Sequence, residues 1–122
     1  KNNVKINFLG RVDYSTLQEI YKNYRIFIMP SLFEGNPKAL LEALASGCLV
    51  VALNNKNISE IIVHKKNGIL IYPETDLEAE LKKYLSSESD FNKITIAGYD
   101  YIKKNNLIDY LFNKEIEIYQ NL

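Results

Sequence analysis

The sequence has no net charge and very little cysteine, and both shortages exclude classes of protein. Fifteen lysine and arginine residues balance fifteen aspartate and glutamate residues, so no net field draws the chain onto nucleic acid. We therefore expect no nucleic-acid partner. The single cysteine, Cys48, cannot form an intramolecular disulfide. This favours a location in the reducing cytoplasm, where disulfides are rare.

Long apolar runs and a secretion signal are also missing. The longest unbroken apolar runs are far shorter than a membrane span, and no charged segment followed by an apolar one opens the chain. We expect a cytoplasmic location.

Candidates for metal binding and nucleophilic catalysis are scarce. His64 is the only histidine, and its position beside Lys65 at a predicted helix end is typical of an interaction with the helix dipole. Cys48 directly precedes an apolar run, which predicts a small buried side chain rather than a nucleophile. We expect neither a metal nor an organic cofactor.

What the sequence does contain is the composition of one globular domain. The chain has 122 residues, of which 47% are apolar and 25% charged, enough for one modest core. Residues 1–122 are therefore interpreted as a single domain. Because the chain starts at Lys1 directly before a strand-like run, we interpret it as a fragment of a longer protein.

Four short apolar runs rich in β-branched residues predict strands, and helical patterns separate them. The alternation predicts a Rossmann-like α/β fold with a parallel sheet of about four strands and flanking helices. After Pro73 no further strand is expected, so residues 73–122 form a helical C-terminal part. The predicted strands are Val4–Leu9, Arg25–Met29, Leu49–Leu53 and Gly68–Tyr72.

The helices are predicted from amphipathic stripes and from residues that favour helix ends. Ser15 with Gln18, and Thr75 with Glu78, have the spacing of capping boxes, and Gly47 suits a C-terminal stop. The predicted helices are Tyr14–Tyr24, Pro37–Gly47, Ser59–His64, a helix following Thr75, Ser89–Lys104 and Leu107–Asn121.

The most informative stretch is residues 29–43, a strand end followed by a tight loop and a helix start. Ligands of open parallel sheets bind beyond the carboxyl ends of strands, and free amides at a helix N-terminus favour a phosphate group. Glu34 and Glu42 flank this position, and ionised carboxylates accept hydrogen bonds from sugar hydroxyls. The combination indicates a nucleotide sugar.

A structural interpretation competes with this one. Lys38, Glu42 and Ser46 recur every four residues, so Glu42 alone would fit the solvated stripe of a buried helix. Glu34 alone would fit a loop carboxylate near a helix N-terminus. The two carboxylates together, in this loop, favour the functional interpretation.

Residues 30–47, Pro-Ser-Leu-Phe-Glu-Gly-Asn-Pro-Lys-Ala-Leu-Leu-Glu-Ala-Leu-Ala-Ser-Gly, resemble the E-x7-E signature of family 4 glycosyltransferases of the GT-B fold. Val4–Arg11 resembles the family's V-x-F-x-G-R segment, and residues 59–70 resemble its P-E-I-I…N-G-x-L segment. The similarity covers residues 4–72. It departs from the family at Asn55–Glu60, where Gly-Gly-x-Pro-Glu is usual, and it lacks the upstream segment whose arginine and lysine hold the diphosphate.

The resemblance implies roles for particular residues. Glu34 would contact hydroxyls of the transferred sugar and act as the catalytic residue, and Glu42 would bind the ribose. The remaining donor-binding residues would be Gly35, Asn36 and Pro37 along the sugar and diphosphate, the amides near Lys38, Ala39 and Leu40 at the distal phosphate, and Gly10, Arg11 and Val12 beside the base.

The resemblance also implies an activity. The parent would be a bacterial glycosyltransferase of the hexosyltransferase type that transfers a sugar, with retention and without a metal, from a UDP- or GDP-sugar. The acceptor would be a glycan or lipid-linked molecule held by an N-terminal domain, in polysaccharide, lipopolysaccharide or glycolipid synthesis. This chain alone would be inactive. A non-catalytic α/β module and a nucleotide-sugar epimerase or phosphorylase remain alternatives.

The resemblance finally raises a question about the sheet. In a doubly wound sheet, Val4–Leu9 and Arg25–Met29 would be separated by two upstream strands. We predict that they pair directly in this chain, joined by a right-handed crossover through Tyr14–Tyr24. The alternative is that a second copy closes the gap in a homodimer.

Overall fold

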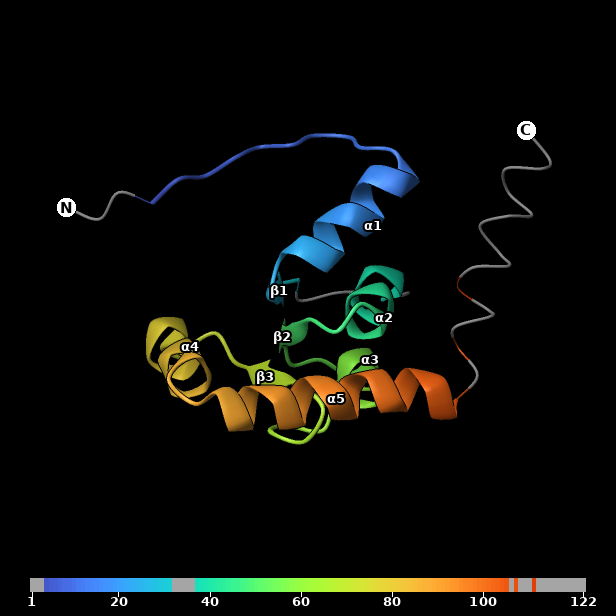
Figure 1. Cartoon of the computed structure of the whole chain (residues 1–122). Helices are drawn as coiled ribbons and strands as arrows, with labels where there is room; N and C mark the ends of the chain where they lie inside the picture. The colour runs from blue at the N-terminus through green and yellow to red at the C-terminus, as the bar shows by residue number, and fades with distance from the viewer. Residues whose placement is uncertain (1–3, 32–36, 106, 108–110, 112–122) are drawn as a thin grey trace.

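The computed structural model describes residues 4–31, 37–105, 107 and 111. This part of the chain forms a parallel sheet with helices around it, which confirms the predicted α/β class (Figure 1). The predicted helix Leu107–Asn121 lies almost entirely outside the described residues. The elements are α1 (Tyr14–Asn23), β1 (Ile26–Met29), α2 (Lys38–Ala45), β2 (Leu49–Leu53), α3 (Lys56–Ser59), β3 (Ile69–Ile71), α4 (Leu77–Leu85) and α5 (Glu88–Lys104).

The sheet has three strands within the described residues, in the order β1-β2-β3, and all neighbours are parallel. In the register, Ile26 pairs with Leu49 and Val51 pairs with Ile69. Every residue of β2 is buried, which is typical of a central strand covered on both faces. Three of the four predicted strands are therefore confirmed, with ends that differ by at most one residue.

Each face of the sheet carries its own hydrophobic core because side chains alternate along β2. Val50 and Ala52 face a core with α1, α2 and residues near α3. Leu49, Val51 and Leu53 face the other core. That second core is completed by β3 and by Tyr84, Phe91 and Ile94 of α4 and α5.

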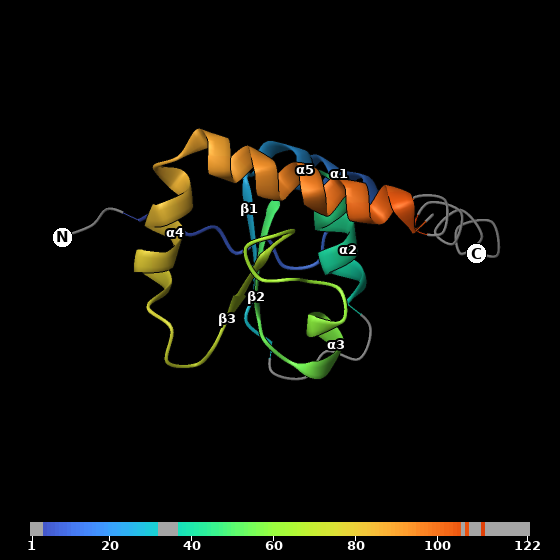
Figure 2. The same ribbon diagram turned by 90° about the horizontal axis from the view of Figure 1, so that it is seen from below.

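Helix α5 joins the two cores by crossing the sheet at the amino ends of the strands (Figure 2). Arg25, directly before β1, donates hydrogen bonds of 3.1 and 3.2 Å to the carboxylate of Glu88, the first residue of α5. The Arg25 guanidinium also lies 4.3 Å from the centre of the Phe91 ring. These contacts fix the start of α5 beside the start of β1 and leave the carboxyl ends of the strands on the opposite edge.

Two helices begin with a different cap from the predicted one. The Asp13 side chain accepts a 2.7 Å hydrogen bond from the Thr16 amide and caps α1, so the predicted capping box at Ser15 is wrong. The Asp76 side chain likewise accepts from the Ala79 amide and caps α4, in place of Thr75. A carboxylate is the better acceptor at a helix N-terminus because it also interacts favourably with the helix dipole.

The segment between β2 and β3 differs from the prediction of a helix over Ser59–His64. Asn55 caps the short helix α3, which ends at Ser59, and a turn follows. The buried side chain of Asn67 holds this turn. It accepts a 2.7 Å hydrogen bond from the Val63 amide and donates a 3.0 Å bond to the Ile61 carbonyl.

His64 has a structural role that differs from the predicted interaction with a helix end. It lies beyond α3, and its Nδ1 accepts a 3.0 Å hydrogen bond from the Leu70 amide of β3. The imidazole therefore ties the turn to the last strand.

The predicted strand Val4–Leu9 does not form. Residues 4–9 are exposed and belong to no sheet, and β1 pairs only with β2 among the described residues. The predicted direct pairing of Val4–Leu9 with Arg25–Met29 is therefore wrong. Figure 1 shows this N-terminal segment, in dark blue, passing over α1 rather than lying beside β1.

Candidate functional site

Helix α2 is the element that positions the candidate site. Leu40 and Ala43 are fully buried and Leu44 is nearly so, which fixes α2 on the sheet beside β1 and β2. The helix begins after the buried Pro37, whose cap position has no side-chain hydrogen bond, and it ends before Gly47 at φ +82°. Its N-terminus faces the carboxyl edge of the sheet because α2 returns the chain from the end of β1 to the start of β2.

The first turn of α2 offers backbone amides rather than side chains to a ligand. The Leu40 side chain is fully buried in the core, and those of Lys38 and Ala39 are partly buried. Leu40 can therefore contact an anion only through its backbone amide at the helix N-terminus.

Glu42 lies in the second turn of α2 with its side chain only 11% exposed. Its Oε1 is 3.7 Å from Nζ of Lys38, whose side chain is 29% exposed. Burial raises the pKa of Glu42 above its ordinary value, and the positive charge and hydrogen bond of Lys38 only partly oppose this. The interpretation of Glu42 as part of a solvated stripe is therefore wrong.

The Glu42 side chain faces a cleft between α1 and α2. The cleft has a volume of about 290 Å³ and is lined by Tyr14, Gln18, Tyr21, Lys22, Glu42, Ala45, Ser46 and Leu111. Carboxylate, amide, hydroxyl and ammonium groups thus converge on one space of the size of a small-molecule site. Burial raises the pKa of Tyr21 to about 12, and the nearby Glu42 carboxylate adds to this shift.

The α1 residues of this cleft were not among the sequence-predicted site residues. Tyr21 belongs to the apolar stripe of α1, and Tyr14 opens that helix, so neither carries a signal of its own. Only the packing of α1 against α2 brings them to Glu42. The Tyr14 ring lies 5.9 Å from Nζ of Lys38, which links the start of α1 to the start of α2.

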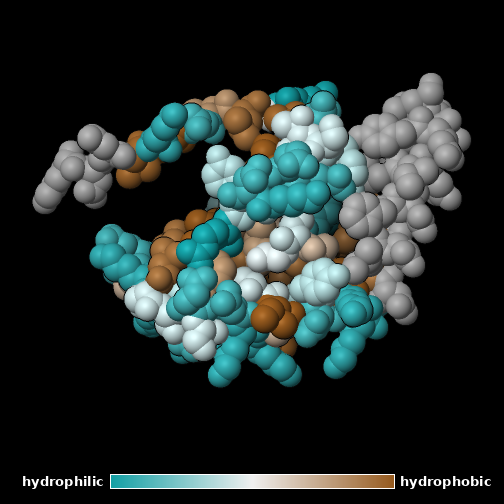
Figure 3. Space-filling model, viewed as in Figure 1, coloured by the Kyte–Doolittle hydropathy of each residue, from teal (hydrophilic) through white to brown (hydrophobic). Residues whose placement is uncertain are grey.

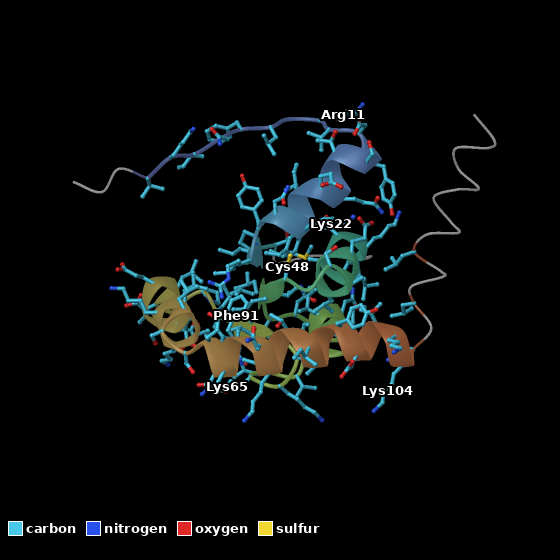
Figure 4. The ribbon with its side chains drawn as sticks, viewed as in Figure 1. Arg11, Lys22, Cys48, Lys65, Phe91 and Lys104 are labelled. Carbon is cyan, nitrogen blue, oxygen red and sulfur yellow. The ribbon has the colours of Figure 1, made fainter. Side chains whose placement is uncertain are left out.

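The predicted turn at Gly10, Arg11 and Val12 directly precedes α1. Gly10 adopts φ +63°, a backbone conformation that favours glycine. Arg11 is exposed on the outer side of the turn, and it forms no ion pair within the described residues (Figure 4). The turn is thus near Tyr14 in the sequence.

Three of the predicted site residues, Glu34, Gly35 and Asn36, lie outside the described residues. Their roles stay predictions. Among the residues that the structure describes, no three His, Cys, Asp or Glu side chains gather as metal ligands would. In the same part of the chain, no helix combines the length and the apolar character that a membrane span requires.

The predicted burial of Cys48 is confirmed, since the side chain is only 3% exposed (Figure 4). Its Sγ donates hydrogen bonds of 3.2 and 3.4 Å to the carbonyls of Tyr21 and Tyr24. Burial raises the pKa of the thiol. Cys48 therefore connects the end of α1 to the start of β2 and is not placed as a nucleophile.

A parallel sheet with helices on both faces and a helix N-terminus at its carboxyl edge defines a Rossmann-like α/β protein. The chain belongs to the family described as "Glycosyl transferases group 1", whose sequence profile matches residues 1–101. Membership of this family confirms the predicted glycosyltransferase resemblance.

Individual proteins show the same relationship. The chain is 40% identical over 70 residues to an uncharacterized glycosyltransferase, MJ1607, from Methanocaldococcus jannaschii, which covers 57% of this chain and 18% of that protein. It is 33% identical over 90 residues to alpha-monoglucosyldiacylglycerol synthase from Streptococcus pneumoniae, covering 74% of this chain and 20% of that protein. The chain thus spans about a fifth of the curated relatives it matches.

A solved structure is similar over most of the chain. It is the C-terminal domain of a glycosyl transferase group 1 family protein, LpcC, from Francisella tularensis. The TM-score is 0.69 at 31% sequence identity, and the match covers 81% of this chain and 51% of that one. The described fold therefore corresponds to about half of such a C-terminal domain.

Proposed function

We propose that this chain forms part of the donor-binding domain of a retaining glycosyltransferase that uses a UDP- or GDP-linked sugar. The observation that carries this proposal is the position of Glu42. Its carboxylate is held in a cleft beside α2, about one turn from the helix N-terminus, where it can accept hydrogen bonds from two neighbouring ribose hydroxyls.

Other groups of this chain would bind the phosphate, the sugar and the base of the donor. The amides near Lys38, Ala39 and Leu40 would receive the distal phosphate at the start of α2, where the helix dipole favours negative charge. Glu34 would then hold the transferred sugar, with Gly35, Asn36 and Pro37 lining the sugar and diphosphate. Gly10, Arg11 and Val12 would lie beside the base.

The chemistry follows from this placement. As the glycosidic bond breaks, negative charge grows on the leaving diphosphate, and amides and cations aimed at it would lower the barrier without a metal ion. The acceptor would be a glycan or a lipid-linked molecule bound outside this chain. A lipid-linked acceptor is supported by the similarity to a diacylglycerol glycolipid synthase, and it would place the parent at the cytoplasmic membrane face in glycolipid or polysaccharide synthesis.

Ligand-observed NMR on the 122-residue chain tests the proposal. Saturation transfer is expected from the protein to UDP, GDP, UDP-sugars and GDP-sugars. The ribose protons should be among those that receive the most saturation. A non-catalytic module would give no transfer to any of the four ligands. Glu42→Ala should abolish the ribose signal, whereas Glu74→Ala, which removes an exposed carboxylate, should leave it unchanged.

A further inference from the structure

We propose that the Lys38 side chain is a cationic contact for the diphosphate of the donor, and that it moves from Glu42 to the diphosphate when the donor binds. The inference rests on the proposed donor site, and it adds a side chain to the backbone amides assigned there. It begins from the ion pair of these two residues, in which Nζ of Lys38 lies 3.7 Å from Oε1 of Glu42.

This ion pair has its charges in the less stable order for a helix. The N-terminus of a helix carries partial positive charge, so a pair three or four residues apart is more stable with the carboxylate first. The other ion pairs within helices of the described residues follow that order: Glu19–Lys22 in α1, and Glu78–Lys82 and Glu80–Lys83 in α4. Of these pairs, only that of α2 places its lysine first, at the first residue of the helix.

Burial adds to the cost of this arrangement. The Lys38 and Glu42 side chains are 29% and 11% exposed, whereas Glu78 and Lys82 of α4 are largely in solvent. Figure 3 shows that the outer side of α4, at the left of the view, is hydrophilic. Loss of hydration makes a buried ion pair a poor source of stability, and departures from such local rules are typical of functional sites. The order and the burial of this pair therefore indicate a role in binding.

The Lys38 ammonium group lies where the cleft meets the start of α2. Its Nζ is 5.9 Å from the centre of the Tyr14 ring, and both Tyr14 and Glu42 line the cleft. Helical side chains lean toward the N-terminus of their helix, and lysine has a long flexible stem. From the first residue of α2, the ammonium group can therefore turn from Glu42 to an anion that the helix amides hold.

A diphosphate competes well with Glu42 for this ammonium group. It carries more negative charge than one carboxylate, and it would bind at the end of the helix where positive charge is concentrated. When Lys38 turns to the phosphate, the Glu42 carboxylate can accept hydrogen bonds from the ribose hydroxyls in its place. The two parts of the nucleotide are thereby recognised together, whereas a nucleoside without phosphate leaves the ion pair intact.

Saturation-transfer NMR titrations of the 122-residue chain test the role of Lys38. The ligands are UDP and uridine, or GDP and guanosine if the chain binds that nucleotide instead. Lys38→Gln should weaken nucleotide binding at least tenfold without weakening nucleoside binding, and Lys38→Arg, which keeps the charge, should restore most of the loss. Lys82→Gln removes the exposed lysine of the α4 pair and should change neither affinity. Circular dichroism checks the fold of each variant.

Inorganic pyrophosphate, followed by phosphorus NMR, tests the exchange of partners. Glu42→Gln should bind pyrophosphate more tightly than the wild-type chain, because no carboxylate then holds Lys38. In the Lys38→Gln background the same change should give no gain. Removal of a repelling negative charge alone would give the same gain in both backgrounds.

The outcomes separate this inference from the donor site itself. If the wild-type chain shows no transfer to either nucleotide, the donor site is refuted and the inference falls with it. If a nucleotide binds but Lys38→Gln binds it as tightly as Lys82→Gln does, only the inference is refuted. An equal loss of nucleotide and nucleoside has the same meaning. If Lys38→Gln does not fold, the lack of a gain in pyrophosphate affinity for Glu42→Gln still overturns the proposal.

Discussion

The carboxylate of Glu42 lies 3.7 Å from the ammonium group of Lys38, yet the ion pair does not offset the cost of burying Glu42. The folded chain therefore binds the Glu42 proton more tightly than the unfolded chain does. Ionised Glu42 opposes folding at neutral pH, and this cost disappears as the pH falls below the ordinary pKa of 4.5.

We predict that Glu42→Gln stabilises the chain at pH 7. A neutral amide of the same shape avoids burial of the charge, so the free energy of unfolding should rise. The gain should shrink as the pH falls through the raised pKa of Glu42 and vanish below pH 4.5. Urea unfolding across this range measures the effect, with Glu74→Gln as an exposed control that should show no gain. A variant less stable than wild type at pH 7 would contradict the expectation.

In the full-length parent, Glu42→Ala should mainly raise KM for the donor and Glu34→Ala should mainly lower kcat. The ribose is held equally in the ground and transition states, whereas sugar placement matters most as the bond breaks. Loss of a hydrogen bond to a charged group costs about 1.5–3 kcal/mol, so kcat/KM should fall at least tenfold in each. Steady-state kinetics with both variants within twofold of wild type would refute the assignment.

The chain alone should bind nucleotide sugars with millimolar affinity and transfer no sugar. By the family resemblance, the arginine and lysine that hold the diphosphate would lie upstream of the segment that this chain matches, and the acceptor would be bound outside it. A change from micromolar to millimolar affinity corresponds to a loss of about 4 kcal/mol in binding free energy. Isothermal titration calorimetry with UDP-glucose measures it, and a micromolar dissociation constant would be inconsistent with this account.

Asn67→Ala should destabilise the chain by about 1–3 kcal/mol. The change removes both hydrogen bonds that hold the turn before β3 and leaves the Val63 amide and the Ile61 carbonyl without their partner. Chemical unfolding at pH 7 measures the loss. Asn92→Ala, on the exposed side of α5, should change stability by less than about 0.5 kcal/mol.

Cys48 should react with thiol reagents only when the protein unfolds. The thiol is buried and its pKa is raised, so little thiolate is accessible at neutral pH. Alkylation should be slow in the native chain and fast in denaturant. A Cys48→Ala/Ser89→Cys double variant moves the thiol to an exposed position and should react rapidly in both conditions. Fast native alkylation of Cys48 would show that α1 opens readily.

Local patterns predicted those parts of the fold that depend on neighbouring residues. The apolar run Leu49–Leu53 became β2 with the same bounds, and Gly47 took the left-handed conformation expected after a helix. The predicted caps differed from the observed ones because several acceptors compete within a few residues. Asp13 and Asp76, each close to a predicted cap, are the observed N-cap residues, and their negative charge interacts favourably with the helix dipole.

Features that depend on distant parts of the chain could not be read from the sequence. Val4–Leu9 alternates as a strand does, but a strand also needs a partner, and none of the described residues supplies one. Likewise, the four-residue spacing of Lys38, Glu42 and Ser46 suggested a solvated stripe. Only the packing of α1 against α2 shows that Glu42 is enclosed.

The absence of a side chain at Gly98 has a consequence for how firmly α2 is held. A Cβ atom there would lie 2.8 Å from Cδ2 of Leu44, so α5 sits directly against α2, while Ala43 and Leu40 fix α2 to the sheet. Helix α2 is therefore packed between the sheet on one side and α5 on another. If a parent glycosyltransferase closes around its substrates, we expect this segment to move as one rigid body about a hinge outside it.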